Sequence, residues 1–437
     1  MTDNVLAVSS EERRPLAARS RVSLLGACIF LYVISTVLFA TKSSTYLIAD
    51  AVGFGLAFVY IAQLFAHRRL LRIPVPLVCL GVFICYCTLQ MAWAPGAGQL
   101  LATLMQLFVL STIIVTFEAD QDHSLVIELA LYGAIIATFV YTLASHEVSL
   151  GGRYGSTLVN ANAYAEVLMY GALIALRRAV LESVKGTLTY KKLLPLLGFY
   201  GLTLYGIAFL TGSRKGIILV VLGSVLIIWY WVWQQPPQYR ILIMILVAAV
   251  FAGVAFGLYQ SPQAKRLVYL GNFLQGSGTV DTSLLLRDDL IKEAVRVWLQ
   301  KPFTGWGVGM FQSLSAYGLY AHDNYLELLA NDGLIGLVCY LMIYITTFGS
   351  LLRSLWRSQK GPLRVDIFWG LVVIIVFVVW DTAAVSYYEK VPWIMLSLVI
   401  GIAVRARRLQ RQAAEKIEPV ARTEDLPVFR TDSSERG

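Results

Sequence analysis

Several short stretches of this sequence carry residue types that could bind an anion and move a proton. One of them, TGSRKG over 211–216, places Arg214 and Lys215 between two glycines at the boundary of an apolar run. The planar fork of an arginine matches a phosphate group, so this turn predicts an anion site with Lys215 as a further substrate contact. A plain tight turn, whose cations reach out to the lipid–water interface, is the alternative.

A second stretch, LLLRDDLIKEAVRVWLQKPF over 284–303, has the spacing of an amphipathic helix lying on a membrane surface. Arg287 follows its apolar start, and Asp288 and Asp289 fall in the first turn, where the helix dipole favours carboxylates. The acidic pair could also suggest a metal, but adjacent side chains on a helix diverge. We therefore expect no metal and no other cofactor. The apolar run before Arg287 could tuck this residue back toward the membrane.

The stretch AHDNYLELLANDGLIGL over 321–337 leads directly into an apolar run and holds one of the four histidines. An imidazole next to polar neighbours can act as a general base near neutral pH. We interpret His322 in this way and expect Asp323 and Tyr325 to contact substrate; a purely structural histidine at a helix start is the common alternative. The Asn-Asp-Gly sequence that ends at Gly333 predicts a break between the polar lead-in and the membrane span.

Two further stretches are less specific. GGRYGSTLVNANAYAE over 151–166 offers Arg153 and Asn160 as substrate contacts at the start of another apolar run. GWGVGMF over 305–311 is rich in glycine, but it matches neither nucleotide-binding glycine pattern, so we interpret it as a flexible bend that brings the chain back across the site.

The rest of the chain must place these stretches in a membrane. Of the 437 residues 57% are hydrophobic and 14% charged, and mean hydropathy is +0.67. Apolar runs are repeatedly long enough to cross a bilayer core of ~30 Å, where helices satisfy their own backbone. We therefore predict an all-α polytopic membrane protein with about twelve spans. They cover 22–41, 46–66, 75–92, 99–117, 125–144, 157–176, 193–210, 216–233, 241–259, 328–350, 365–381 and 391–404.

The distribution of Lys and Arg predicts the orientation. Most of the 36 basic residues fall on one side if the N-terminal tail, 1–21, is cytoplasmic. The transmembrane domain is then 22–404, a basic and partly disordered tail covers 405–437 on the cytoplasmic side, and one long, partly helical loop, 260–327, lies outside. We find no cleaved signal peptide in the first residues. The polar stretches described above all fall on the outer face, so a substrate there must arrive already attached to a lipid.

The net charge of +9 could indicate a nucleic-acid partner. No soluble module with interleaved aromatic and basic residues accompanies that charge, so we attribute it to the cytoplasmic loops and expect no nucleic acid. The five cysteines lie in apolar runs and are interpreted as small buried side chains.

The order of the motifs resembles that of a known family. TGSRKG after an apolar run, the stretch from Arg287 through Pro302 to the glycine-rich bend, and His322 followed by YLELLANDGLIGL are together similar to the O-antigen ligase and Wzy-type polysaccharide polymerase superfamily, over about 200–345. The resemblance implies a metal-independent glycosyltransferase that uses a polyprenyl-diphosphate-linked glycan. It also implies that Arg214 and Arg287 bind the diphosphate and that His322 is the base.

One position departs from the family pattern, because Asp323 stands where an asparagine commonly follows the histidine. A carboxylate there would raise the basicity of His322. The chemistry of the residues agrees with the resemblance: arginines would stabilise the diphosphate leaving group while the histidine takes the acceptor proton, and a single displacement would invert the sugar.

Several functional alternatives stay open. The acceptor would be a lipid A core glycan in a ligase and another lipid-linked repeat in a polymerase, with the site on the outer face of a bacterial inner membrane and both termini cytoplasmic. A polytopic transporter or flippase is the alternative of another class. Such a protein should carry charges near the bilayer midplane, whereas here the polar residues gather at one face.

Overall fold

The computed structural model describes residues 23–39, 45–67, 73–94, 96, 98–120, 124–145, 153–238, 240–241, 244–245, 248 and 282–424. Within these ranges the chain is helical and has no β-strand, as predicted. Most of the predicted span 241–259, the 260–281 part of the predicted outer loop and the last residues of the tail lie outside them.

The helices follow the apolar runs of the sequence. Their bounds are α1 Leu24–Phe39, α2 Tyr46–His67, α3 Val75–Leu89 continued by η2 Gln90–Ala92, α4 Gly98–Asp120, α5 Ser124–Ser145, η4 Ser156–Leu158, α6 Ala161–Val184, α7 Tyr190–Tyr205 continued by the π-helical η5 Gly206–Thr211, α8 Arg214–Gln234, α11 Thr282–Gln300, α12 Phe311–Leu314, α13 Asn324–Arg357, α14 Pro362–Asp381 and α15 Lys390–Glu424.

Among the described residues, 8 helices are long and apolar enough to cross a membrane: α2, α3 with η2, α4, α5, α7 with η5, α8, α13 and α14. Helix α1 is apolar but shorter, and α6 and α15 cover two more predicted spans. The protein is therefore a multi-pass membrane protein, while the total of about twelve spans stays a prediction.

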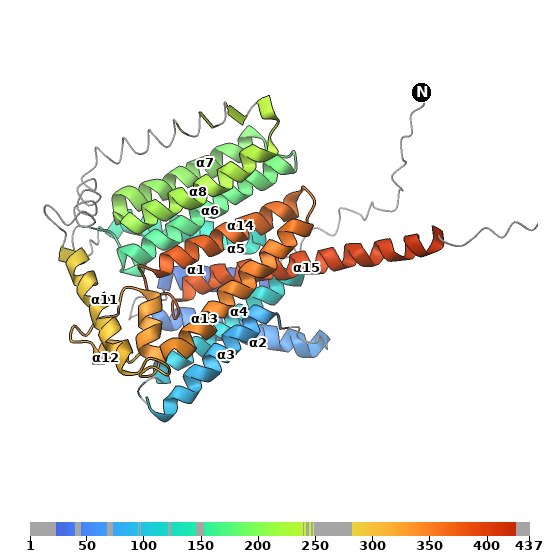
Figure 1. Cartoon of the computed structure of the whole chain (residues 1–437). Coiled ribbons are helices and arrows are strands. Elements are labelled where there is room, and N and C mark those ends of the chain that lie inside the picture. Colours follow the sequence, from blue (N-terminus) through green and yellow to red (C-terminus); the bar gives the residue numbers. More distant parts are fainter. Residues whose placement is uncertain are drawn as a thin grey trace, which may run out of the picture.

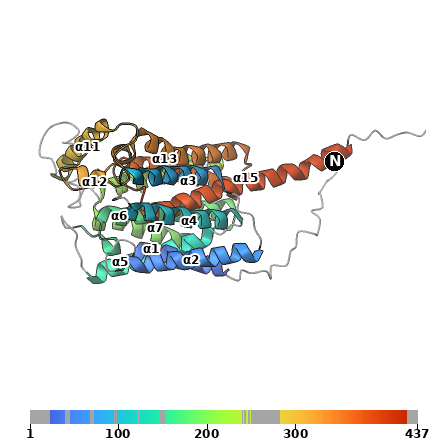
Figure 2. The ribbon, with the colours of Figure 1, turned by 90° about the horizontal axis from the view of Figure 1, so that it is seen from below.

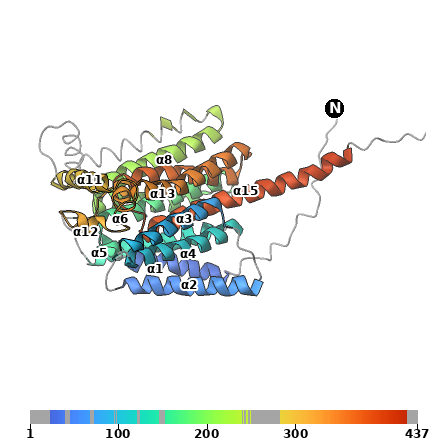
Figure 3. The same cartoon turned by 60° about the horizontal axis from the view of Figure 1, so that its bottom comes forward.

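The long helices run roughly alongside one another in a bundle (Figure 1). Helix α15 passes through the bundle against α4, α13 and α14 and then projects well beyond the ends of its neighbours (Figure 2). Helices α11 and α12 lie at the opposite end of the bundle, where α11 packs on α13 (Figure 3). The polar stretches predicted to carry chemistry meet at this α11 end.

Helix α13 is broken at Gly333, where the sequence predicts a break; this residue has φ 66° and ψ −171°. The break frees backbone N–H groups that would otherwise bond within the helix. The carbonyls of Pro302 and Phe303 accept two of them, from Leu334 at 2.9 Å and Ile335 at 3.2 Å. Irregular backbone inside a membrane protein persists only where such partners exist, so the segment after α11 completes the broken helix.

The glycine-rich stretch 305–311 is the other half of this arrangement. Gly307 donates its N–H to the carbonyl of Asn331 at 2.7 Å, and the side chain of Gln90 bonds both Val308, 2.9 Å from its Oε1, and Thr304, 3.1 Å from its Nε2. The predicted bend is thus present, but backbone and amide hydrogen bonds hold it in place against α3 and α13.

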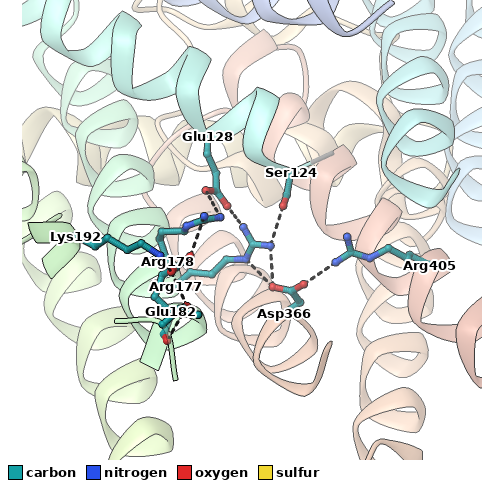
Figure 4. Close-up of polar contacts among 9 residues, drawn as sticks. Ser124, Glu128, Arg177, Arg178, Glu182, Lys192, Asp366 and Arg405 are labelled. Atoms are coloured by element: carbon teal, nitrogen blue, oxygen red, sulfur yellow. Dashed lines mark hydrogen bonds and ion pairs between the residues drawn. The ribbon is translucent and has the colours of Figure 1, made fainter. Parts of the chain in front are cut away.

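At the opposite end of the bundle, buried charges connect five helices (Figure 4). The guanidinium of Arg177 pairs with Asp366, at 2.9 Å from Nε, and with Glu128. Arg405 bonds the other oxygen of Asp366 at 2.6 Å and lies 3.0 Å from Glu118. Removing one partner would leave an uncompensated buried charge, so this network constrains how α4, α5, α6, α14 and α15 pack.

The break in α13 gives a test of the fold. A Cβ at Gly333 would lie 2.2 Å from the backbone oxygen of Phe303, at a φ that side chains rarely adopt. We expect Gly333→Ala to lower the free energy of unfolding by roughly 3 kcal/mol or more, the sum of backbone strain and a backbone clash. Thermal unfolding of the purified protein in detergent measures this.

Gly349→Ala is the matched control, since this glycine lies in the regular part of α13 with nothing within 4 Å of the added Cβ. The control should be neutral or up to ~1 kcal/mol more stable than wild type. Equal melting temperatures for the two variants would contradict the role given to the break.

Candidate functional site

His322 occupies an unusual backbone position directly before α13. Its φ is 57°, in the left-handed region, which costs a residue with a Cβ roughly 1–2 kcal/mol. Histidine is among the types that adopt this conformation most often. The imidazole lies against the ring of Tyr320, with centroids 4.1 Å apart. The His322 side chain therefore packs against the residue two positions before it in the chain.

The two residues predicted to contact substrate beside His322 have structural partners instead. The Asp323 carboxylate caps α13, accepting the N–H of Leu326 at 2.9 Å, and burial raises its pKa. The Tyr325 hydroxyl donates to the carbonyl of Val378 at 2.8 Å. Sequence reasoning treated both as site residues because they flank a histidine, whereas a helix start needs a capping carboxylate at this position.

Asn324 ties the start of α13 to the loop between α14 and α15. Its amide oxygen accepts the N–H groups of Ser386 at 3.0 Å and Tyr387 at 3.2 Å, and its amide nitrogen donates to Asp381 at 3.1 Å. Asp381 also accepts the hydroxyl of Tyr344 at 2.9 Å. This buried polar network fixes the loop beside His322.

His322 is electrostatically tuned toward its neutral form. Burial, the largest cause, and the positive charges of Arg287 and Lys215 together lower the pKa of the imidazole to about 4. No carboxylate contributes to this shift, so the expectation that Asp323 raises the basicity of His322 is not met. A neutral imidazole can accept a proton, and the shift places Arg287 and Lys215 within electrostatic reach of it.

A cavity of about 670 Å³ opens beside His322. One part of its wall is formed by Lys215 of α8, Asn160 at the start of α6 and Tyr320. Arg214 and Arg287 are not among the residues that line it. The cavity therefore brings together His322, Lys215 and Asn160 from the predicted set, with Arg287 acting on them through its charge.

The side chain of Lys215 lies against the C-terminal end of α14. Its ammonium donates to the carbonyl of Ala383 at 2.8 Å and lies 3.9 Å from the ring centre of Trp380. Arg214 begins α8 directly before it, and Ser213 caps the helix by accepting the N–H of Gly216 at 3.4 Å. The TGSRKG stretch is thus a tight turn whose two cations begin α8, and the anion site stays a prediction.

Arg153 and Asn160 connect their own stretch to the TGSRKG turn. Arg153 donates to the carbonyl of Thr211 at 2.5 Å and to the Asn162 oxygen at 3.0 Å, which also accepts the Ser213 hydroxyl at 3.0 Å. Asn160 caps α6, accepting the N–H of Asn162 at 2.8 Å. Both residues therefore form hydrogen bonds that stabilise the fold at this end of the bundle, and Asn160 also lines the cavity.

Arg287 lies near the start of α11, whose buried face packs on the first half of α13. The neighbouring Asp288 does not converge with Asp289, because its carboxylate accepts the Lys292 ammonium at 2.6 Å, one helical turn away. A surface i, i+4 pair of this kind contributes little to stability. The acidic pair therefore has an ordinary helical role.

Sequence reasoning missed the opposite wall of the cavity, which α2 and α4 supply. Asp50 accepts the Gln106 amide at 3.1 Å and pairs with Lys390 at the start of α15, and Gln99 lines the same wall. An acidic residue near the end of a membrane helix is by default a functional hypothesis with a partner to be named. Asp50 is such a residue, but its partner Lys390 lies too far along the chain to be inferred from the sequence.

With this geometry in view, comparison with known families is informative: residues 199–341 match a family model described as O-antigen ligase. The predicted resemblance is confirmed. Over this segment, the membrane protein is similar to the O-antigen ligase family. The matched segment runs from α7 into α13 and contains Arg214, Arg287 and His322. No curated protein matches the chain in a sequence search.

The tuning of His322 in this O-antigen ligase-like protein predicts a pH-dependent stability. The folded protein keeps His322 neutral down to about pH 4, while the unfolded chain protonates it below its usual value of 6.5. Stability from this residue is therefore lost as pH falls from 6.5 toward 4. Between pH 7 and pH 5 the loss should be about 2 kcal/mol, and His322→Gln should abolish it.

Melting temperatures of wild type and His322→Gln at both pH values measure this difference. Other titrating groups cancel in the comparison, because both proteins contain them. An identical fall in melting temperature for the two proteins would show that the imidazole is not held neutral.

Proposed function

We propose that this protein is an inverting glycosyltransferase that moves a saccharide from a polyprenyl-diphosphate carrier onto a hydroxyl acceptor, as an O-antigen ligase would. The observation that carries the proposal is the meeting of His322 and Lys215 in one cavity, with Arg287 close enough to lower the pKa of the histidine. A neutral base beside fixed cations is what a reaction with an anionic leaving group and a hydroxyl nucleophile requires.

The reaction is a single displacement at the anomeric carbon of the donor. The bond from this carbon to the diphosphate oxygen breaks as the bond to the acceptor oxygen forms, and the hydroxyl proton passes to His322. Arg214, Arg287 and Lys215 stabilise the charge that develops on the leaving diphosphate. One displacement inverts the configuration of the sugar.

Binding of the donor also activates the base. In the empty site, burial together with Arg287 and Lys215 holds the pKa of His322 at about 4. A diphosphate between the cations and the imidazole offsets their charge, so the pKa of the histidine rises toward the range in which it accepts a proton effectively. The base is therefore strengthened only when the leaving group is in place.

The proposed location is the outer face of a bacterial inner membrane. Helices α8, α13 and α15 begin at the cavity end of the bundle and α14 ends there, which is consistent with a site at one membrane face. The Lys and Arg distribution favours that face being the outer one, with both termini cytoplasmic. Nucleotide-sugars are not present on that face, but a lipid-linked donor carries its own diphosphate leaving group.

We assign the acceptor to the wall formed by α2 and α4. Its Asp50, Gln99 and Gln106 side chains offer the mixture of amides and a carboxylate that binds sugar hydroxyls. Both helices lie outside the matched segment 199–341, so they are the part of the site free to differ with the acceptor. A lipid A core glycan makes the protein a ligase, and a lipid-linked repeat makes it a polymerase with the same donor chemistry.

The donor side is tested by His322→Ala, Arg287→Ala and Arg214→Ala. Each should lower glycan transfer at least ~100-fold, because each removes the base or a charge that stabilises the leaving group. Transfer is followed with purified protein in nanodiscs and a polyprenyl-diphosphate-linked glycan.

Arg296→Ala is the control for Arg287→Ala. It lies on the same helix and pairs with Glu293 at 2.7 Å on the surface, so transfer should stay at the wild-type rate. Full activity of Arg287→Ala, or an equal loss in the control, would remove Arg287 from the reaction.

The acceptor side is tested by Gln99→Ala, which removes an amide from the α4 wall. We expect the KM for the acceptor to rise about fivefold or more, the effect of a lost hydrogen bond of ~1 kcal/mol, while the KM for the donor stays unchanged. Met105→Ala on the same helix is the control, since Met105 is exposed away from the cavity. An equal rise for donor and acceptor would contradict the division of the cavity into two sides.

Deleting the gene distinguishes ligase from polymerase. Full-length lipid-linked chains that stay unattached to the surface acceptor identify a ligase, and products that stop at a single repeat identify a polymerase.

A further inference from the structure

A cluster of arginines lies at the end of the bundle opposite the cavity, between the last turns of α13 and the projecting part of α15. The side-chain amide of Gln410 donates to the carbonyl of Ser354 at 2.8 Å and to the hydroxyl of Ser358 at 2.9 Å. These bonds lay α15 along the end of α13. From Gly333 to this end, α13 runs ~35 Å at 1.5 Å per residue, about the thickness of a bilayer core.

Both helices present arginines at this contact. Arg353 and Arg357 are one turn apart on α13, and Arg407 and Arg411 are one turn apart on α15, on either side of Gln410. Burial lowers the pKa of Arg407, and so do the charges of Arg353, Arg411 and Arg357. The four cations therefore face one another across the contact and repel.

Other arginines at this end of the bundle are compensated. Arg177 and Arg405 share Asp366 (Figure 4), and Arg408 lies 3.2 Å from Asp120. Within the described residues, Arg353, Arg357, Arg407 and Arg411 form no ion pair. Helix α15 thus turns its paired arginines toward α4 and α14 and its unpaired ones toward α13.

The helix dipole does not account for the cluster. Arg357 lies in the last turn of α13, where a cation is favoured, but Arg407 and Arg411 lie well inside α15, which continues to residue 424. Trp356 beside the cluster is 77% exposed. An exposed tryptophan at the end of a membrane helix is typical of the headgroup region of a bilayer.

We propose that this arginine cluster, Arg353, Arg357, Arg407 and Arg411, is a binding site for the phosphate of an anionic phospholipid headgroup. The guanidinium groups supply several donors to one phosphate, and the anion removes the repulsion that the empty cluster carries. The exposed Trp356 favours a lipid over a free phosphate, because it places apolar surface beside the charge. The site is independent of the glycosyl transfer proposed above.

The test compares wild type with the double variant Arg353→Gln/Arg407→Gln in nanodiscs of phosphatidylcholine with or without phosphatidylglycerol. Retention of phosphatidylglycerol by the purified protein, measured by native mass spectrometry, should fall on the order of 25-fold in the variant, at about fivefold for each of the two arginines removed near a headgroup. Phosphatidylglycerol should raise the melting temperature of wild type but not of the variant. Without it, the variant should be at least as stable as wild type, because its repulsion is smaller.

Arg408→Gln is the matched control, one residue away on α15 and paired with Asp120; it should retain phosphatidylglycerol as wild type does. A double variant that is less stable than wild type in phosphatidylcholine alone would indicate a structural role and overturn the proposal. Equal retention by the two proteins would also overturn it. So would an equal stabilisation of wild type by inorganic phosphate, which would identify a site for a free anion.

Discussion

The arrangement of the site depends on how the broken helix α13 satisfies its backbone. An N–H group left without a partner inside a membrane costs several kcal/mol, so a break at Gly333 is tolerable only if other backbone groups replace the lost bonds. The carbonyls of Pro302 and Phe303 do so. Since Pro302 lies only two residues after the end of α11, this exchange fixes α11 to the first half of α13, and with them the positions of Arg287 and His322.

A second constraint acts on the other side of His322. Asn324 bonds the loop between α14 and α15 through Ser386 and also donates to the buried Asp381, so the backbone before α13 cannot relax without breaking this network. That rigidity explains how a histidine stays in the left-handed region despite the strain. The strain is compensated by polar groups that are themselves buried and fully engaged, which keeps the imidazole facing the cavity.

Much of the fold follows from patterns that are local in the sequence. Apolar runs predicted the positions of the described membrane helices, and Asn-Asp-Gly predicted the break at Gly333. Two residues that the linear motifs predicted for the site, Lys215 and His322, line the same cavity. The sequence could not reveal the pairing of Asp50 with Lys390, because hydropathy carries no information on which helices become neighbours. It likewise led to the expectation that Asp323 contacts substrate, and the capping bond of this residue becomes visible only once the helix start is known.

The two ends of the bundle use buried charge in opposite ways. At the end that holds Arg177, each carboxylate meets a cation, and such pairs determine which helices pack together more than they raise stability. At the cavity end, Lys215 and Arg287 instead disfavour a positive charge on His322, because all three groups would then carry charges of the same sign. An anion that enters between Lys215 and Arg287 is stabilised by its attraction to both cations. In the proposed reaction, the developing charge on the leaving diphosphate gains most from them, and the barrier falls because these cations are already held in place before the donor binds.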